Sequence, residues 1–350
     1  MKFFFIFCLI VNFSIFSCNS DNEKNLNNFV LDDQKFSIFS YEIKSIYDLF
    51  KLRYGFSEIS EEHKQIKNLL LEEIYENDLN FIFRIIFPLP EFTTGYSPKL
   101  LVISPRDKIF REDELLLIHN LSLEEINKIE ESIMSEIGYS SVVVNIGGVA
   151  AYPSIIKETD NYGDLFKAHA HEWLHQYLIL FPLGRAYFKD TNMKIVNETL
   201  ANIYSERLFN NVCSKKIKLQ DVICNSKKNI LSDKFNYQLF IKNLRLDVDE
   251  LLKSGKINQA EKQMESARAE LESKGFYVRK INQAWFAFNG TYADSPASSS
   301  NIDQEIESFI DSQESLGDAI KKLRKVKNFE EYKNLISQKN NIQKKLILVI

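Results

Sequence analysis

The pattern His171-Glu172-Trp173-Leu174-His175 constrains this chain more than any other feature of its sequence. Residues four apart on a helix lie on one face, with Cβ atoms roughly 5–6 Å apart. His171 and His175 can therefore direct imidazole nitrogens at one ion, at about 2.0–2.1 Å each. Glu172 lies about 100° further round the helix, where its carboxylate can reach a water on that ion. The pattern thus predicts two zinc ligands and a general base.

The residues around this pattern are typical of a buried helix. Asp160 or Asn161 offers an N-cap, and no proline interrupts residues 161–181. Pro182-Leu183-Gly184 then supplies a helix stop. Residues 176–180 carry no charge, so the helix can lie inside a core. The alternative is a surface helix that carries two unrelated histidines.

A second helix is predicted directly afterwards, over residues 193–209, from apolar residues at helical spacing. Glu198, Asn202 and Glu206 form a polar stripe on another face of this helix, each four residues from the next. A hydrolytic zinc site needs a third protein ligand and one open position. The connection between the two helices is long enough to bring Glu198 back over the histidines. We therefore predict Glu198 as the third ligand; the alternative is that the stripe is simply solvated.

These motifs resemble those of the gluzincins, zinc peptidases of the thermolysin-like kind. Members pair H-E-x-x-H on one helix with a glutamate on the next, commonly preceded by Asn, as in Asn197-Glu198-Thr199. The resemblance implies one zinc ion on His171, His175 and Glu198, with Glu172 as the base. It implies hydrolysis of a peptide or protein substrate.

One position departs from the family pattern. In thermolysin-like enzymes an Asp four residues after the ligand glutamate orients the first histidine, and here that position is Asn202. Its amide oxygen can accept the same hydrogen bond but carries no charge. More loosely, residues 85–340 are similar to a group of uncharacterised bacterial peptidases associated with the cell envelope.

The N-terminus is typical of an export signal. Residues 3–16 are almost wholly apolar, too short for a permanent membrane span but suited to the core of a signal peptide. Ile15-Phe16-Ser17-Cys18 resembles a lipoprotein cleavage box. We predict that residues 1–17 are removed, that Cys18 is lipidated, and that residues 18–34 form a tether in a bacterial cell envelope, outside the cytoplasm. An ordinary secretory signal or a buried N-terminal helix are the alternatives.

The composition agrees with an exported globular protein. The chain has 350 residues, 45% of them hydrophobic, which is ample for a core. Its net charge of −4 argues against nucleic acid as a partner. Once Cys8 has left with the signal and Cys18 is acylated, Cys213 and Cys224 remain. They form either one disulfide in an oxidising compartment or two buried free thiols.

We expect an α+β fold that is predominantly α-helical, with a small sheet packed beside the metal helix. Residues 99–104 and 140–146 are the predicted strands, and Gly147 and Gly148 follow the second. Gluzincins bind an extended peptide on an edge strand beside the metal helix, so the resemblance makes these two glycines part of a substrate strand. A simple turn is the alternative. Aminopeptidases of this clan place a glutamate in that strand to hold the amino terminus of the substrate. No acidic residue occurs between residues 140 and 156, so the resemblance disfavours an aminopeptidase.

The chain divides into six predicted segments. A signal peptide over 1–17 and a tether over 18–34 precede an N-terminal helical region over 35–87. The zincin catalytic core spans 88–212, a linker spans 213–234, and a C-terminal helical domain spans 235–350.

An aromatic segment, residues 283–296, interrupts the C-terminal helices. A tetrahedral intermediate needs an oxyanion donor besides the metal. All the histidines lie at or before His175, so a histidine from the C-terminal part cannot serve. Some gluzincins use a histidine for this role and others a tyrosine, so the resemblance makes Tyr292, close to Asn289-Gly290, the predicted donor. The alternative is that Tyr292 only packs against the aromatic residues before it.

The hypothesis is zinc-dependent peptide-bond hydrolysis by a lipid-anchored envelope protein. The alternatives are a catalytically inactive zinc-binding lipoprotein that acts as a binding module, and a helical scaffold with an accidental motif.

Overall fold

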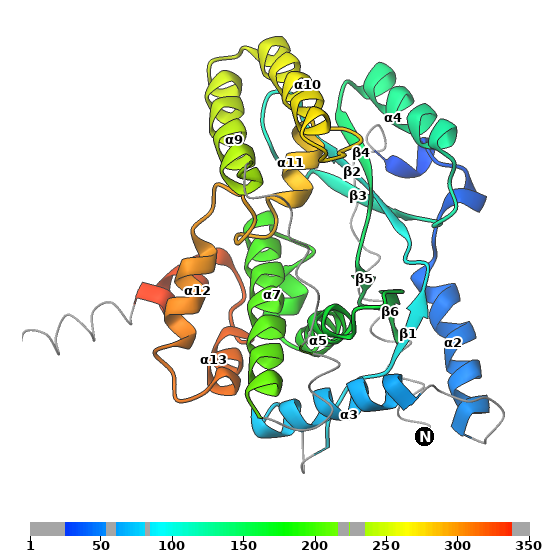
Figure 1. Cartoon of the computed structure of the whole chain (residues 1–350), viewed down its shortest axis with the longest axis vertical. Helices are drawn as coiled ribbons and strands as arrows, with labels where there is room; N and C mark the ends of the chain where they lie inside the picture. The colour runs from blue at the N-terminus through cyan, green and yellow to red at the C-terminus, as the bar shows by residue number, and fades with distance from the viewer. Residues whose placement is uncertain (1–24, 54–60, 81–84, 216–223, 225–234, 338–350) are drawn as a thin grey trace, which may run out of the picture.

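Two helices form the centre of the molecule in the computed structural model (Figure 1). The structure describes residues 25–53, 61–80, 85–215, 224 and 235–337. The two central helices are α5 (Tyr162–Leu178) and α7 (Thr191–Ser214). The Asn161 side chain accepts from the backbone N–H groups of Gly163 and Asp164, which caps the first turn of α5. The short helix α6 (Pro182–Ala186) lies between them and begins with proline. The predicted pair of helices is therefore present, with α7 longer than expected.

The larger sheet is antiparallel, with strand order β3-β2-β4. Its strands are β2 (Lys99–Ser104), β3 (Asp113–Leu117) and β4 (Ser140–Asn145). Successive residues of β2 point to opposite faces of the sheet. Leu101 and Ile103 join a core with helix α4 (Leu123–Ile137), whereas Leu100 and Val102 join a core with the C-terminal helices. Both faces are covered, which explains the unbroken apolar sequence of β2.

A smaller sheet lies beside α5 and has the strand order β1-β6-β5. Its strands are β1 (Phe92–Gly95), β5 (Gly148–Val149) and β6 (Ser154–Lys157). The Gln176 side chain of α5 donates to Ser154 Oγ at 2.9 Å, which ties the helix to β6. Within the described residues β5 pairs only with β6, so β5 is an edge strand next to α5.

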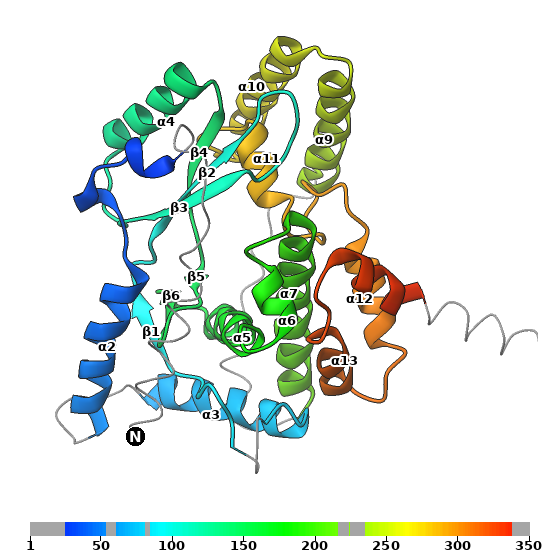
Figure 2. The same ribbon diagram turned by 180° about the vertical axis from the view of Figure 1, so that it is seen from behind.

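The remaining helices enclose these central elements (Figure 2). The N-terminal part contributes α2 (Ile38–Arg53) and α3 (Glu61–Glu76), preceded by the 3-10 turns η2 (Leu26–Asn28) and η3 (Asp32–Gln34). The C-terminal part contributes α9 (Tyr237–Lys253), α10 (Ile257–Ser273), α11 (Gln283–Asn289), α12 (Ile302–Ile310) and α13 (Leu316–Leu323). α9, α10 and α11 cover the larger sheet, while α12 and α13 share the core of α5 and α7. The C-terminal helices thus belong to the same cores as the central elements.

The predicted fold class, α+β with mostly helix, is confirmed by the structure. The predicted strands are β2 and β4, and the other four strands were not predicted. Cys213, in α7, forms a disulfide with Cys224. The predicted signal peptide and Cys18 lie outside the described residues. Within the described part of the chain, no helix is both long and apolar enough to cross a membrane.

Candidate metal centre

The two histidines of α5 point toward each other across one turn of the helix. Their Nε2 atoms lie 2.9 Å apart, and their rings meet edge to face with centroids 4.6 Å apart. Both side chains are 14% exposed, so they face an opening and not the sealed core. The helical spacing of four residues therefore places two imidazole nitrogens at one point, as predicted.

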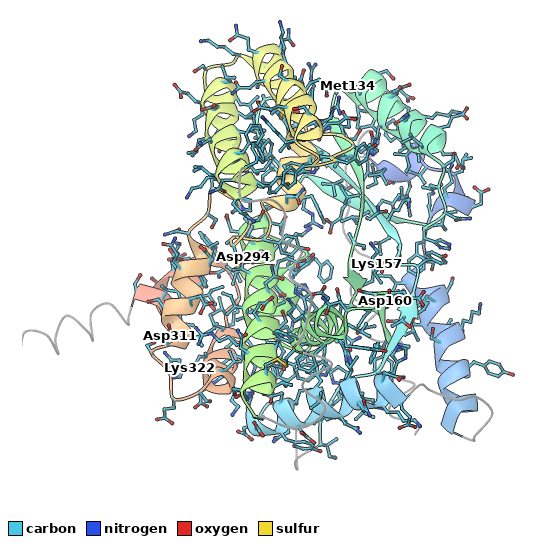
Figure 3. The ribbon with its side chains drawn as sticks, viewed as in Figure 1. Met134, Lys157, Asp160, Asp294, Asp311 and Lys322 are labelled. Atoms are coloured by element: carbon cyan, nitrogen blue, oxygen red, sulfur yellow. A yellow bond between two sulfur atoms is a disulfide. The ribbon has the colours of Figure 1, made fainter. Side chains whose placement is uncertain are left out.

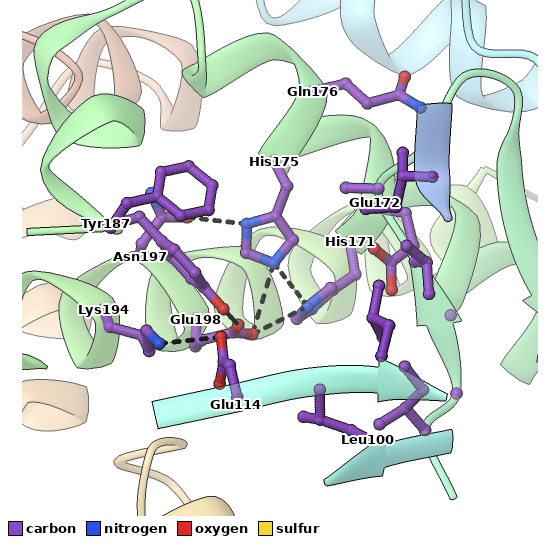
Figure 4. A pocket seen from close by; sticks show the side chains of 18 of the residues that line it. Leu100, Glu114, His171, Glu172, His175, Gln176, Tyr187, Lys194, Asn197 and Glu198 are labelled. Carbon is purple, nitrogen blue, oxygen red and sulfur yellow. Dashed lines mark hydrogen bonds and ion pairs between the residues drawn. The ribbon is translucent and has the colours of Figure 1, made fainter. Parts of the chain in front are cut away.

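Glu198 brings a carboxylate to the same point from α7 (Figure 4). Its Oε2 atom lies 3.3 Å from His171 Nε2 and 3.4 Å from His175 Nε2. Ligands that bind a tetrahedral ion at 2.0–2.1 Å are separated from one another by about 3.3 Å. The two carboxylate distances match that spacing, and the nitrogen pair is slightly closer. These buried and half-buried groups could hold a metal ion.

Asn197, directly before Glu198, fixes the orientation of His175. Its Oδ1 atom lies 2.8 Å from His175 Nδ1. Since an amide oxygen only accepts, this contact places a proton on Nδ1, so Nε2, which faces His171 and Glu198, is the nitrogen of this ring that could bind an ion. A carbonyl or carboxylate behind a ligating histidine is the usual arrangement in metal sites. The donor set and the partner behind His175 therefore fit a bound cation.

Glu172 lies beside the three ligand atoms but outside the cluster. Its side chain is buried against Gly148 of β5, where an added Cβ atom would lie 2.5 Å from Glu172 Oε1. No described residue donates a hydrogen bond to its carboxylate. Burial raises the pKa of Glu172, while the two imidazoles oppose the change. A carboxylate with a raised pKa and no protein donor is suited to take a proton from water.

Tyr292 lies at the cavity on the side of His171. Its ring centroid is 6.5 Å from that of His171, and its ring meets Phe288 edge to face. Burial, and next the charge of Glu198, raise the pKa of Tyr292 well above its ordinary value, so the phenol stays protonated at neutral pH. Its hydroxyl has no hydrogen-bond partner in the described part of the chain. Tyr292 therefore packs against the aromatic segment and also lies at the cavity that contains His171.

Tyr187, at the end of α6, is a second phenol at the site. Its hydroxyl donates to Glu198 Oε1 at 2.7 Å, and its ring meets the His175 ring with centroids 6.0 Å apart. Burial, and next the charge of Glu198, raise the pKa of Tyr187 well above its usual value. Tyr187 is therefore a hydrogen-bond donor that already has its acceptor, whereas the Tyr292 hydroxyl has none.

A cluster of buried and half-buried charges lies beside Glu198. Glu114 of β3 pairs with Arg111 and accepts from Lys194 Nζ of α7 at 3.0 Å. Arg111 Nη1 also donates to Thr291 Oγ1 at 3.2 Å. Burial lowers the pKa of Lys194, and Glu114 opposes that change. The cluster connects β3, α7 and the segment after α11 around the site.

The three candidate ligands line one cavity of about 1620 Å³. Both glycines of the predicted substrate strand, Gly147 and Gly148, lie on its wall with Glu172 and Tyr292. Asn202 also lines it, but does not take the predicted role. Its amide nitrogen donates to Asp294 Oδ1 at 3.2 Å, beside α7 (Figure 3), and the partner of a ligating ring is instead Asn197.

The fold also brings to this site several residues for which no role was predicted. They are Arg111, Glu114, Tyr187, Lys194 and Asn197. Asn197 carried a signal, since it precedes Glu198 in the pattern that resembles the gluzincins. Arg111 and Glu114 carried none, because the charged run from residue 111 to 114 hides the start of β3.

A scan of protein-family models and searches of curated proteins and of solved structures found no match to this chain.

Proposed function

We propose that the chain is a zinc-dependent hydrolase of peptide bonds, related to the gluzincins. The supporting observation is the convergence of His171 Nε2, His175 Nε2 and Glu198 Oε2 within 4.8 Å of one another. Two imidazoles and one carboxylate suit zinc, and three protein ligands leave a position for water. Glu172 lies directly beside this group, without a protein donor on its carboxylate.

Zinc held by these three residues would supply Lewis-acid activation of a water and of the scissile carbonyl. In this proposal Glu172 takes the proton of the attacking water and passes it to the leaving amine. The free hydroxyl of Tyr292 donates to the oxyanion that develops on the carbonyl oxygen. Tyr187 is not assigned this role, because its hydroxyl is already bonded to Glu198.

The proposed substrate is an extended peptide or a protein segment. β5 is an edge strand in the described structure, and it lies next to Glu172. An extended chain can add to such an edge through backbone hydrogen bonds. Gly148 has no side chain between that edge and the base, so a scissile bond can lie close to Glu172. Attachment to an envelope membrane through Cys18 is part of the proposal.

Cleavage of a peptide library by the purified, zinc-loaded chain is the direct test. We expect cleavage that a chelator abolishes and that added zinc restores, because the proposed chemistry depends on the ion. Mass spectrometry of the products would show whether internal or terminal bonds are cut. Zinc binding without cleavage of any peptide would favour the inactive binding module, and absence of metal binding would reject both.

Gly148→Ala should lower kcat by about 10–100-fold, since a small displacement of a catalytic group can cost about 100-fold. The added Cβ atom would lie 2.5 Å from Glu172 Oε1 and 2.9 Å from Glu172 Cδ, so the carboxylate must move. Zinc content should stay the same, because none of the three ligands is touched. Steady-state kinetics and metal analysis measure both quantities.

Gly147→Ala is the matched control for this variant. An added Cβ atom at Gly147 meets nothing within 4 Å. The Glu172 carboxylate is then undisturbed, so kcat should remain close to that of the unmodified chain, and any change should be in KM, because Gly147 belongs to the proposed substrate strand. Equal rates for both alanine variants would contradict the assignment of Glu172 as the base beside β5.

A further inference from the structure

Tyr187 holds the carboxylate oxygen of Glu198 that does not face the imidazoles. Its hydroxyl donates to Oε1 at 2.7 Å, while Oε2 of the same carboxylate faces both Nε2 atoms at 3.3 and 3.4 Å. The two oxygens of Glu198 thus have different partners. Figure 4 shows the Tyr187 hydroxyl at one oxygen of the carboxylate and both imidazoles at the other.

The surroundings of Tyr187 keep its ring in this position. The Nζ atom of Lys194 lies 5.0 Å from the centre of the ring, and Lys194 is itself bonded to Glu114 at 3.0 Å. The edge of the ring packs against His175. The Lys194 ammonium over the Tyr187 ring and the His175 imidazole beside it restrict the movement of the phenol. The hydroxyl therefore remains on Oε1.

We propose that Tyr187 is a positioning residue that makes Glu198 a one-oxygen ligand of the metal, an inference that rests on the proposed zinc site. A carboxylate can bind a cation through one oxygen or through both. If Oε1 is held by a phenol, only Oε2 remains for the ion. The protein then supplies three donor atoms and leaves a position for water and substrate.

Loss of the phenol hydroxyl would remove this restriction. In Tyr187→Phe the ring still fills its space, but Oε1 loses its donor. A carboxylate oxygen without a partner at a buried site gains by turning toward the ion. Glu198 should then bind through both oxygens, and the number of protein donor atoms should rise from three to four. Loss of an outer partner also typically weakens metal binding by about 10–100-fold.

The visible spectrum of the Co²⁺-loaded full chain tests this inference, because the band intensities of cobalt depend on coordination number. We expect the unmodified chain to show strong tetrahedral bands and Tyr187→Phe to show weaker, five-coordinate bands. Titration should also show Co²⁺ binding weakened by about 10–100-fold. Tyr292→Phe is the matched control, since it removes a phenol from the same cavity without touching Glu198. It should leave both spectrum and affinity unchanged.

X-ray absorption on the zinc-loaded unmodified chain provides a second test that does not depend on a variant folding. We expect four nitrogen or oxygen neighbours at about 2.0 Å. Five neighbours, or identical cobalt spectra for Tyr187→Phe and the unmodified chain, would overturn the role of Tyr187 and leave the zinc site intact. Absence of metal binding by the unmodified chain would instead reject the zinc site, and with it this inference.

Discussion

Glu172→Gln is expected to remove nearly all peptide hydrolysis while the chain keeps its zinc. The amide has almost the same shape as the carboxylate, but it cannot take a proton from water. General-base catalysis typically contributes about 10²–10⁴-fold, so kcat should fall by about that factor. The three ligand atoms belong to other residues, so the metal should remain. Kinetics on a cleaved library peptide, with zinc measured per chain, gives both results.

Glu206→Gln is a suitable control for this experiment. Glu206 also lines the cavity, but it is 55% exposed and forms an ion pair with Lys167 at 3.0 Å. Its loss should leave turnover almost unchanged, because exposed ion pairs contribute little. Hydrolysis at the normal rate in Glu172→Gln would reject Glu172 as the base. Loss of zinc in that variant would mean that Glu172 is part of the binding group.

The core of the site was predictable because it depends on helical spacing. His171 and His175 are four residues apart, so an α-helix places them on one face. Glu198 required one more step, a second helix returning across the first. The capping residue Asn161 and the proline that begins α6 mark the ends of these helices in the sequence. Helical spacing and these capping residues, all local features of the sequence, were sufficient to predict the two helices and the histidine pair.

The surroundings of the site were not predictable in the same way, because they come from distant parts of the chain. Glu114 reaches Lys194 only because β3 pairs with β2, and this strand has a charged start that hides it. Tyr187 lies in a connection without any periodic pattern. The position of Asn202 predicted contact with a histidine, yet Asp294, from the segment after α11, takes its amide. Each of these contacts depends on tertiary packing.

Glu198→Gln is expected to have the largest effect on metal binding. The substitution removes the only carboxylate among the three ligands and leaves a neutral amide oxygen, which is a much weaker donor to zinc. Loss of a group that merely orients a ligand costs about 10–100-fold in affinity, so loss of a ligand should cost at least about 100-fold. Competition with a chromogenic chelator would measure the affinity of each variant.

Thermal unfolding of the same variant provides an independent measurement, because an ion that binds only the folded state stabilises it. At a zinc concentration about 100 times the dissociation constant, the unmodified chain gains about 2.7 kcal/mol. At that same concentration a variant that binds about 100-fold more weakly gains only about 0.4 kcal/mol. The rise of Tm on adding zinc should therefore nearly disappear in Glu198→Gln. Glu206→Gln, from the same polar stripe of α7, should keep the full rise. If Glu198→Gln also kept the full rise, Glu198 would not be a ligand and the metal would have to bind elsewhere.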